Sequence, residues 1–174
     1  GERCLTGGLA AYVLSCCSRS ASVTVARRLL ELAWAAAARP TATGMAAVTA
    51  AIVQPLKAGD HVVASKAMFG SCRYVVEGLL PRYGIASTLV YGLDLDQWRK
   101  AMRPNTRSCF LESPTNPTLD VLDLVAIADI PQQGGPRLIG DNVFSTPIWH
   151  SPPAPGPPVV GDSAANPTDR QGPR

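Results

Sequence analysis

The middle of the chain alternates short runs of β-branched residues with longer apolar stretches of helical character. The runs typical of buried strands cover residues 61–65, 86–91, 108–111 and 137–139. The stretches that predict helices cover residues 44–56, 72–80, 94–102 and 122–130. Strands that alternate with helices of this length form right-handed βαβ units. The pattern therefore predicts an α/β domain with a mostly parallel sheet and helices on both of its faces.

Residues that break or cap helices fall at the boundaries of these stretches. Pro55 closes the first predicted helix, and Pro81 together with Gly84 stops the second. Asp94 can cap the third helix, which ends ahead of Pro104. These helix-breaking and capping residues support the helix boundaries that the apolar pattern predicts.

The two ends of the chain lack the same pattern. Residues 25–38 are rich in Ala, Leu and Arg and predict a helix, whereas the residues before them have no strong period. Residues 151–174 hold seven prolines, which forbid a regular helix and leave only a short strand at 159–160. We therefore divide the chain into an N-terminal segment (1–40), a core (41–150) and a proline-rich end.

Composition narrows the class of protein. A chain of 174 residues with 46% hydrophobic and 17% charged residues fits one globular domain. The net charge of +3 comes from scattered arginines, so nucleic-acid binding is not expected. No apolar run approaches the roughly 20 residues of a membrane span, and the first residues do not form a signal peptide pattern.

The five cysteines suggest neither a disulfide framework nor a metal site. Their number is odd, and they form no ligand spacing with His61 or His150. We expect reduced thiols, as in a cytoplasmic protein, and no bound metal.

Acidic residues follow two of the predicted strands. Glu112 comes directly after the strand at 108–111, and Asp141 comes just after the strand at 137–139. Open α/β sheets bind ligands at the carboxyl ends of their strands. A buried carboxylate is costly unless it meets a cation or several donors, and a protonated ring nitrogen would satisfy Asp141. A turn or helix-capping aspartate is the alternative, and the sequence leaves both open.

Three further positions have both a binding and a structural interpretation. Gly44 opens a helix whose N–H groups could bind a phosphate, or it is an ordinary helix start. Phe69 could set its ring against a flat ligand, or pack in the core. The Asn116 amide could bind a ligand, or belong to a loop that Pro114 and Pro117 shape for structural reasons.

Together these positions resemble the pyridoxal-phosphate (PLP) enzymes of cysteine and methionine metabolism, the cystathionine γ-synthase family. The resemblance is carried by six segments in the right order: 44–47 (GMAA), 56–65 (LKAGDHVVAS), 69–72 (FGSC), 79–85 (LLPRYGI), 110–117 (FLESPTNP) and 141–144 (DNVF). It implies part of the large domain of a fold-type I PLP-dependent transferase. It also implies PLP as cofactor, a small amino-acid substrate and a homo-oligomer.

The resemblance further implies roles for individual residues. Gly44 and Met45 would offer backbone N–H groups to the cofactor phosphate. Phe69 would stack on the pyridine ring, and Asp141 would pair with its protonated nitrogen. Asn116 would lie near the phenolic oxygen of the cofactor or near the substrate.

Two more cofactor contacts are implied near the chain ends. Ser163 matches the serine of the family's Ser-Ala-Thr-Lys segment, which touches the phosphate. Arg19 falls where the family has an arginine that reaches the phosphate of a neighbouring subunit; Cys17 stands in place of the tyrosine paired with it.

The same alignment places Asn166 at the Schiff-base lysine. An amide nitrogen is neither nucleophilic nor basic, so Asn166 cannot bond to the cofactor or move the substrate proton. We also expect the family's C-terminal domain to be absent. The resemblance thus implies trans-sulfuration in methionine biosynthesis, with O-succinylhomoserine and sulfide giving homocysteine and succinate. It implies no retained catalytic residue in this chain and weak or no PLP binding.

Two alternatives stay open. The chain could be a non-catalytic remnant that keeps the fold for assembly with an intact relative. It could also be an intact enzyme whose sequence carries frame errors, since the proline- and arginine-rich end is what such errors in GC-rich DNA would produce.

Overall fold

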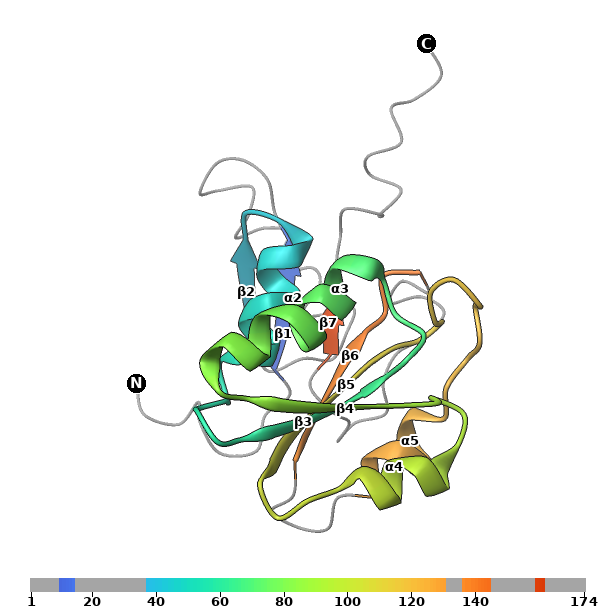
Figure 1. Ribbon diagram of the computed structural model, residues 1–174. Helices are drawn as coiled ribbons and strands as arrows, with labels where there is room; N and C mark the ends of the chain where they lie inside the picture. Colours follow the sequence, from blue (N-terminus) through green and yellow to red (C-terminus); the bar gives the residue numbers. More distant parts are fainter. Residues whose placement is uncertain (1–9, 15–36, 131–135, 145–158, 162–174) are drawn as a thin grey trace.

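The computed structural model describes residues 10–14, 37–130, 136–144 and 159–161. They form a seven-stranded sheet in the order β2-β1-β7-β6-β5-β3-β4, in which every neighbouring pair is parallel (Figure 1). The strands are β1 (Ala10–Leu14), β2 (Ala37–Thr41), β3 (His61–Ser65), β4 (Ala86–Val90), β5 (Thr106–Glu112), β6 (Arg137–Asp141) and β7 (Val159–Gly161). The predicted α/β class with a parallel sheet is confirmed.

Helices cover both faces of this sheet. They are α2 (Gly44–Val53), α3 (Gly70–Tyr74), the π-helical turn η1 (Val75–Leu79), the 3₁₀ turn η2 (Leu80–Tyr83), α4 (Leu95–Ala101) and α5 (Leu124–Ala128). In Figure 1, α2 and α3 lie on one side of β3 to β6, and α4 and α5 lie on the other. Two apolar cores follow from this arrangement.

The two cores are separated by the sheet itself. Val62 belongs to the core under α2 and α3, whereas its neighbour Val63 belongs to the core under α4 and α5. Successive side chains of a strand point to opposite faces, so consecutive valines serve both cores. All five residues of β3 are buried, as expected for a central parallel strand covered on both sides.

The second helical segment does not stop at Pro81 as the sequence predicted. It begins at Gly70, continues through η1, and ends after η2 at Gly84, whose φ of 70° is the left-handed conformation of a C-cap. Pro81 lies in the first turn of η2, a position where a proline, which has no N–H to donate, is tolerated. The prediction that Gly84 ends the segment is confirmed.

The prediction of a helix at 25–38 is wrong for its last two residues. Ala37 and Ala38 belong to β2, and the rest of that stretch lies outside the described residues. β2 is an edge strand, so Pro40 can occupy it without breaking a central ladder. β1 was not predicted at all, while the short strand expected at 159–160 is present as β7.

His61 is a structural residue at the amino end of β3. Its Nδ1 lies 2.8 Å from Thr106 Oγ1 and its Nε2 lies 2.9 Å from Thr88 Oγ1. The sequence had suggested no partner set for this histidine, because both threonines come from other strands. Trp98 of α4 is buried in the core that lies under α4 and α5. Among the residues that the structure places, no helix has the length and apolar character needed to span a bilayer.

Candidate cofactor site

The site lies at the carboxyl edge of the sheet, where β5 and β6 end side by side. Glu112 and Asp141 are the last residues of these strands and pair directly across them. The backbone continues the pairing, because Ser113 N–H donates to the Asp141 carbonyl at 2.9 Å. In-register parallel strands direct paired side chains to the same face. The two carboxyl groups therefore point to the same face, at the strand ends where the sequence placed each acid.

A thiol completes this group. Cys72 of α3, Glu112 and Asp141 are all buried, and one side-chain S or O atom of each lies within 4.8 Å of the others. We name these three residues the acidic cluster. A set of two carboxyls and a thiol attracts positive charge, and it lies at the carboxyl ends of the strands, where open α/β sheets bind ligands.

Glu112 has a strongly perturbed carboxyl group. Its side chain is 2% exposed, and burial raises its pKa to about 7. The N–H of Phe69 opposes this rise by donating to the carboxyl group, and the nearby charge of Asp141 adds to it. Near neutral pH, Glu112 is therefore divided between its protonated and ionised forms.

Asp141 combines the two interpretations that the sequence left open. Its Oδ1 accepts the N–H of Val143 at 3.0 Å, which is a turn hydrogen bond over two residues. The residue is only 6% exposed and belongs to the acidic cluster. The turn bond thus orients a carboxyl group that is held inside the site.

Phe69 connects the loop after β3 to the acidic cluster. Its N–H donates to Glu112 Oε1 at 2.7 Å, and α3 begins at the next residue. The side chain is 48% exposed, so the alternative of a core phenylalanine does not hold. The ring is a surface on which a flat ligand can stack.

The start of α2 reaches the same group of residues. Thr43 is the N-cap, and its hydroxyl accepts the Ala46 N–H at 3.1 Å. The N–H groups of Gly44 and Met45 are in the first turn and have no acceptor within the helix. Met45 Sδ lies 4.0 Å from Cys72 Sγ, which connects the helix start with the acidic cluster. A phosphate at this helix start would be favoured by the N–H groups and the helix dipole.

Asn116 is partly buried in the loop that follows β5. That loop is held by its own hydrogen bonds: the Asp120 N–H donates to Thr115 Oγ1 at 2.9 Å, and Thr118 Oγ1 donates to Asp120 Oδ2 at 2.6 Å. The structural interpretation of the loop is therefore supported. The role of Asn116 toward a ligand stays a prediction.

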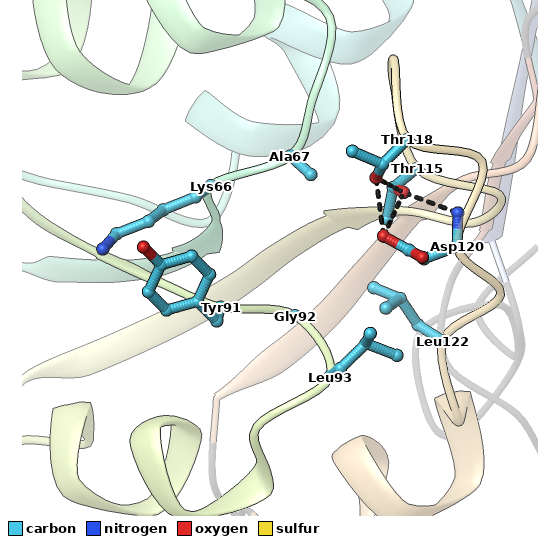
Figure 2. A pocket seen from close by; sticks show the side chains of 9 residues that line it. All are labelled: Lys66, Ala67, Tyr91, Gly92, Leu93, Thr115, Thr118, Asp120 and Leu122. Atoms are coloured by element: carbon cyan, nitrogen blue, oxygen red, sulfur yellow. Dashed lines mark hydrogen bonds between the residues drawn. The ribbon is translucent and has the colours of Figure 1, made fainter.

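A cavity of about 260 Å³ lies beside this loop (Figure 2). It is lined by Lys66, Ala67, Tyr91, Gly92, Leu93, Thr115, Thr118, Asp120 and Leu122. Its polar side chains contact one another. The Lys66 ammonium lies 4.1 Å from the centre of the Tyr91 ring. None of the predicted cofactor residues lines it, so the cavity neighbours the candidate site without forming it.

Contacts through Cys72 and Glu112 connect Met45, Phe69 and Asp141, and Gly44 precedes Met45 at the start of α2. Asn116 lies in the loop after β5. Arg19, Ser163, Asn166 and Cys17 lie outside the described residues.

Sequence reasoning did not assign Cys72 to the site, and it missed the contact between Glu112 and Phe69. Cys72 follows Phe69 by three residues, so its place at the start of a helix after β3 was the available signal.

The chemistry of this edge fits a phosphorylated aromatic cation. Asp141 supplies a buried acidic group for a protonated ring nitrogen, Phe69 supplies a stacking face, and the start of α2 supplies N–H donors for a phosphate. A bound PLP would meet groups of these kinds at its ring nitrogen, its ring face and its phosphate.

Comparison with known sequences gives the same result. The family model for "Cys/Met metabolism PLP-dependent enzyme" matches residues 6–166. An O-succinylhomoserine sulfhydrylase from Mycobacterium tuberculosis is 36% identical over 171 residues, which is 98% of this chain and 42% of that protein. A cystathionine gamma-lyase from Bacillus subtilis is 41% identical over 122 residues, covering 70% of this chain and 32% of its own length. The chain thus spans less than half the length of these relatives.

Solved structures agree in fold. The O-acetylhomoserine sulfhydrylase of Wolinella succinogenes matches with a TM-score of 0.70 at 30% identity, covering 74% of this chain and 36% of that one. A Campylobacter jejuni structure that contains N'-pyridoxyl-lysine-5'-monophosphate matches with a TM-score of 0.75 at 28% identity, covering 80% of this chain and 35% of its own. With the family model matching most of its length, this chain belongs to the PLP-dependent enzymes of cysteine and methionine metabolism.

Proposed function

We propose that this chain is a PLP-binding portion of a trans-sulfuration enzyme that holds the cofactor without catalysing turnover. The observation that carries the proposal is the in-register pairing of Glu112 with Asp141 beside the exposed Phe69 ring. This pairing places a buried acid and a stacking surface at one sheet edge. The family match supports the identity of the ring that they would hold.

For the reaction, the sulfhydrylase relatives favour an acylated homoserine as substrate. We propose O-succinylhomoserine and sulfide as the reactants of the intact enzyme, with homocysteine and succinate as products, as in methionine biosynthesis. PLP, when bound, supplies an electron sink for bond breaking next to the substrate nitrogen. In this chain, Asp141 would keep the ring nitrogen protonated, and Phe69 would hold the ring plane.

The residue expected to bond to the cofactor is missing. Asn166 takes the place of the lysine, and a carboxamide nitrogen cannot attack an aldehyde at neutral pH. The three lysines of the chain are Lys57, Lys66 and Lys100. Of these, Lys66 has its ammonium over the Tyr91 ring, 4.1 Å from the ring centre. We therefore expect reversible, non-covalent and weak PLP binding.

Replacement of Asn166 by lysine tests this proposal. The purified chain and its Asn166→Lys variant are mixed with PLP, reduced with borohydride and digested for mass spectrometry. We expect a pyridoxyl group on the peptide around residue 166 in the variant only. Asn166→Gln is the matched control, because it changes the side chain without adding an amine.

Two results would contradict the proposal. One is a stoichiometric adduct on Lys57, Lys66 or Lys100 of the unchanged chain, which would mean that another lysine has taken over. The other is the absence of saturable PLP binding in both the unchanged chain and Asn166→Lys, which would mean that the cofactor site itself is lost.

The proposal extends to assembly and location. The resemblance implies cofactor sites between subunits, so we propose a homo-oligomer. Sedimentation of the purified chain measures this directly. Cys72 and Cys109 are buried and are not joined in a disulfide, which suits a reducing compartment, and we propose the cytoplasm.

A further inference from the structure

Glu112 makes a contact that no cofactor role requires of it. The residue lies at the end of β5, and its Oε1 accepts the backbone N–H of Phe69 at 2.7 Å. Phe69 belongs to the loop after β3, which is 43 residues earlier in the chain. This hydrogen bond is therefore a tertiary link between the stacking ring and the sheet.

The carboxyl group that makes this hydrogen bond is buried beside a second carboxyl group. Glu112 is 2% exposed, it lies in the acidic cluster, and its in-register partner is Asp141. Two ionised carboxyls at this separation and burial repel each other strongly, and such pairs retain one proton in common. The ring nitrogen of the cofactor would need Asp141, and not Glu112, to carry the charge.

We propose that Glu112 is a positioning residue of the cofactor site: of the two paired carboxyl groups it is the one that takes up a proton, and it ties the Phe69 backbone to the sheet edge while Asp141 carries the negative charge. Oε1 acts as the acceptor for Phe69, so the proton belongs on Oε2. The Asp141 carboxyl has its own donor in Val143 N–H, which favours its ionised form. The division of roles follows from these two hydrogen bonds.

The groups that face Glu112 come from two other elements. Asp141 of β6 raises the pKa of Glu112 through its charge, and Cys72 of α3 lowers it through a hydrogen bond. Burial contributes most and brings the pKa to about 7. Lys66, the nearest lysine along the chain after β3, has its ammonium over Tyr91.

Two substitutions separate the proton from the hydrogen bond. Glu112→Gln is permanently neutral and keeps a carbonyl oxygen for the Phe69 N–H. Glu112→Leu is of similar size and removes the acceptor. The readouts are amide hydrogen exchange at residue 69, the pH dependence of unfolding, and PLP affinity by absorbance titration.

We expect Glu112→Gln to keep the protection of the Phe69 amide and to keep PLP affinity within about threefold at neutral pH, because a carbonyl acceptor contributes the same bond. Glu112→Leu should lose the protection and weaken PLP binding by about tenfold or more. In the unchanged chain, the folding equilibrium constant should fall about tenfold between pH 6 and 8, and this fall should vanish in Glu112→Gln.

The proposal is overturned if Glu112→Gln loses amide protection as fully as Glu112→Leu, or if it keeps the pH dependence of the unchanged chain. The second comparison does not need Glu112→Leu, so it decides the matter even where that variant fails to fold. The inference rests on the proposed function only for the identity of the ring. If no form of the protein binds PLP, the proposed function fails, while exchange at residue 69 and the pH profile still test Glu112.

Discussion

At the scale of single residues, the pKa values of two buried groups, His61 and Glu112, are shifted in opposite directions. His61 lies between two threonine hydroxyls, and burial lowers its pKa to about 4, with Arg103 adding to the effect. Glu112 has its pKa raised to about 7. On acidification, folding is therefore weakened by His61 and strengthened by Glu112. Over the range where both titrate, the two effects oppose each other.

Removal of His61 should reveal this balance. Folded His61 stays neutral while the unfolded residue takes up a proton below pH 6.5, so its contribution is complete above pH 6.5 and is lost as the pH falls to about 4. The loss amounts to roughly 3 kcal/mol. His61→Gln keeps polar contacts to the threonines but cannot titrate. Its difference in unfolding free energy from the unchanged chain should shrink steadily from pH 7 to pH 4, measured by urea denaturation.

A constant difference across this range would mean that the pKa of His61 is the same in the folded and unfolded states. Thr106→Val serves as a control, because it removes one hydrogen bond to the ring and leaves the titratable group in place.

The residue scale is also where sequence analysis reached its limit. The acids at the ends of β5 and β6 were predicted because a strand end is a local feature. The Phe69 contact to Glu112 and the two threonine partners of His61 come from segments far apart in the chain. No local pattern encodes which partner a buried polar atom will meet.

At the scale of elements, the start of α2 matters most for the site. Thr43 caps this helix through the Ala46 N–H, and the next residues are the proposed phosphate contacts. The cap uses one first-turn donor and leaves those of Gly44 and Met45. Capping and anion binding are thus compatible at the same helix end.

Loss of the cap should cost stability. We expect Thr43→Ala to lower the unfolding free energy by about 1 kcal/mol, and Thr43→Ser to lower it much less because the hydroxyl remains. Urea denaturation of both variants measures the effect. Equal loss in both variants would indicate that the methyl group of Thr43, and not its hydroxyl, contributes.

Elements were predicted best where their residues are distinctive. The β-branched run of β3 was placed with its correct bounds, and the Asp94 cap of α4 was identified. β1 and β2 were missed because alanine is common in both and has a helical preference. Their strand state depends on neighbours in the sheet, which local propensity cannot supply.

At the scale of the whole molecule, one sheet separates two apolar cores. Ile52 of α2 is fully buried in one core, and Ile127 of α5 is buried in the other. The order of the strands brings these distant helices to opposite faces (Figure 1). This order is a property of the whole chain and could not be derived from periodicity.

Truncation in either core should destabilise the same fold. We expect Ile52→Ala and Ile127→Ala to cost about 2–5 kcal/mol each, and the double variant to cost nearly the sum, because the sites share no contacts across the sheet. Val125→Ala on the exposed side of α5 is the control and should change stability by less than about 0.5 kcal/mol. Thermal unfolding followed by circular dichroism measures all four. Two resolved transitions within either single variant would show that the two faces unfold independently.

The parallel pairing of β5 with β6 has a calorimetric consequence. Each time the sheet forms near neutral pH, it brings Glu112 opposite Asp141 and draws a hydrogen ion from the solvent. The buffer must release that ion, and its ionisation heat enters the measured enthalpy. The apparent heat of unfolding should therefore differ between phosphate and Tris at one pH, and the difference divided by the difference in buffer heats gives the net number of hydrogen ions that folding takes up, which is the uptake by Glu112 less the release from His61.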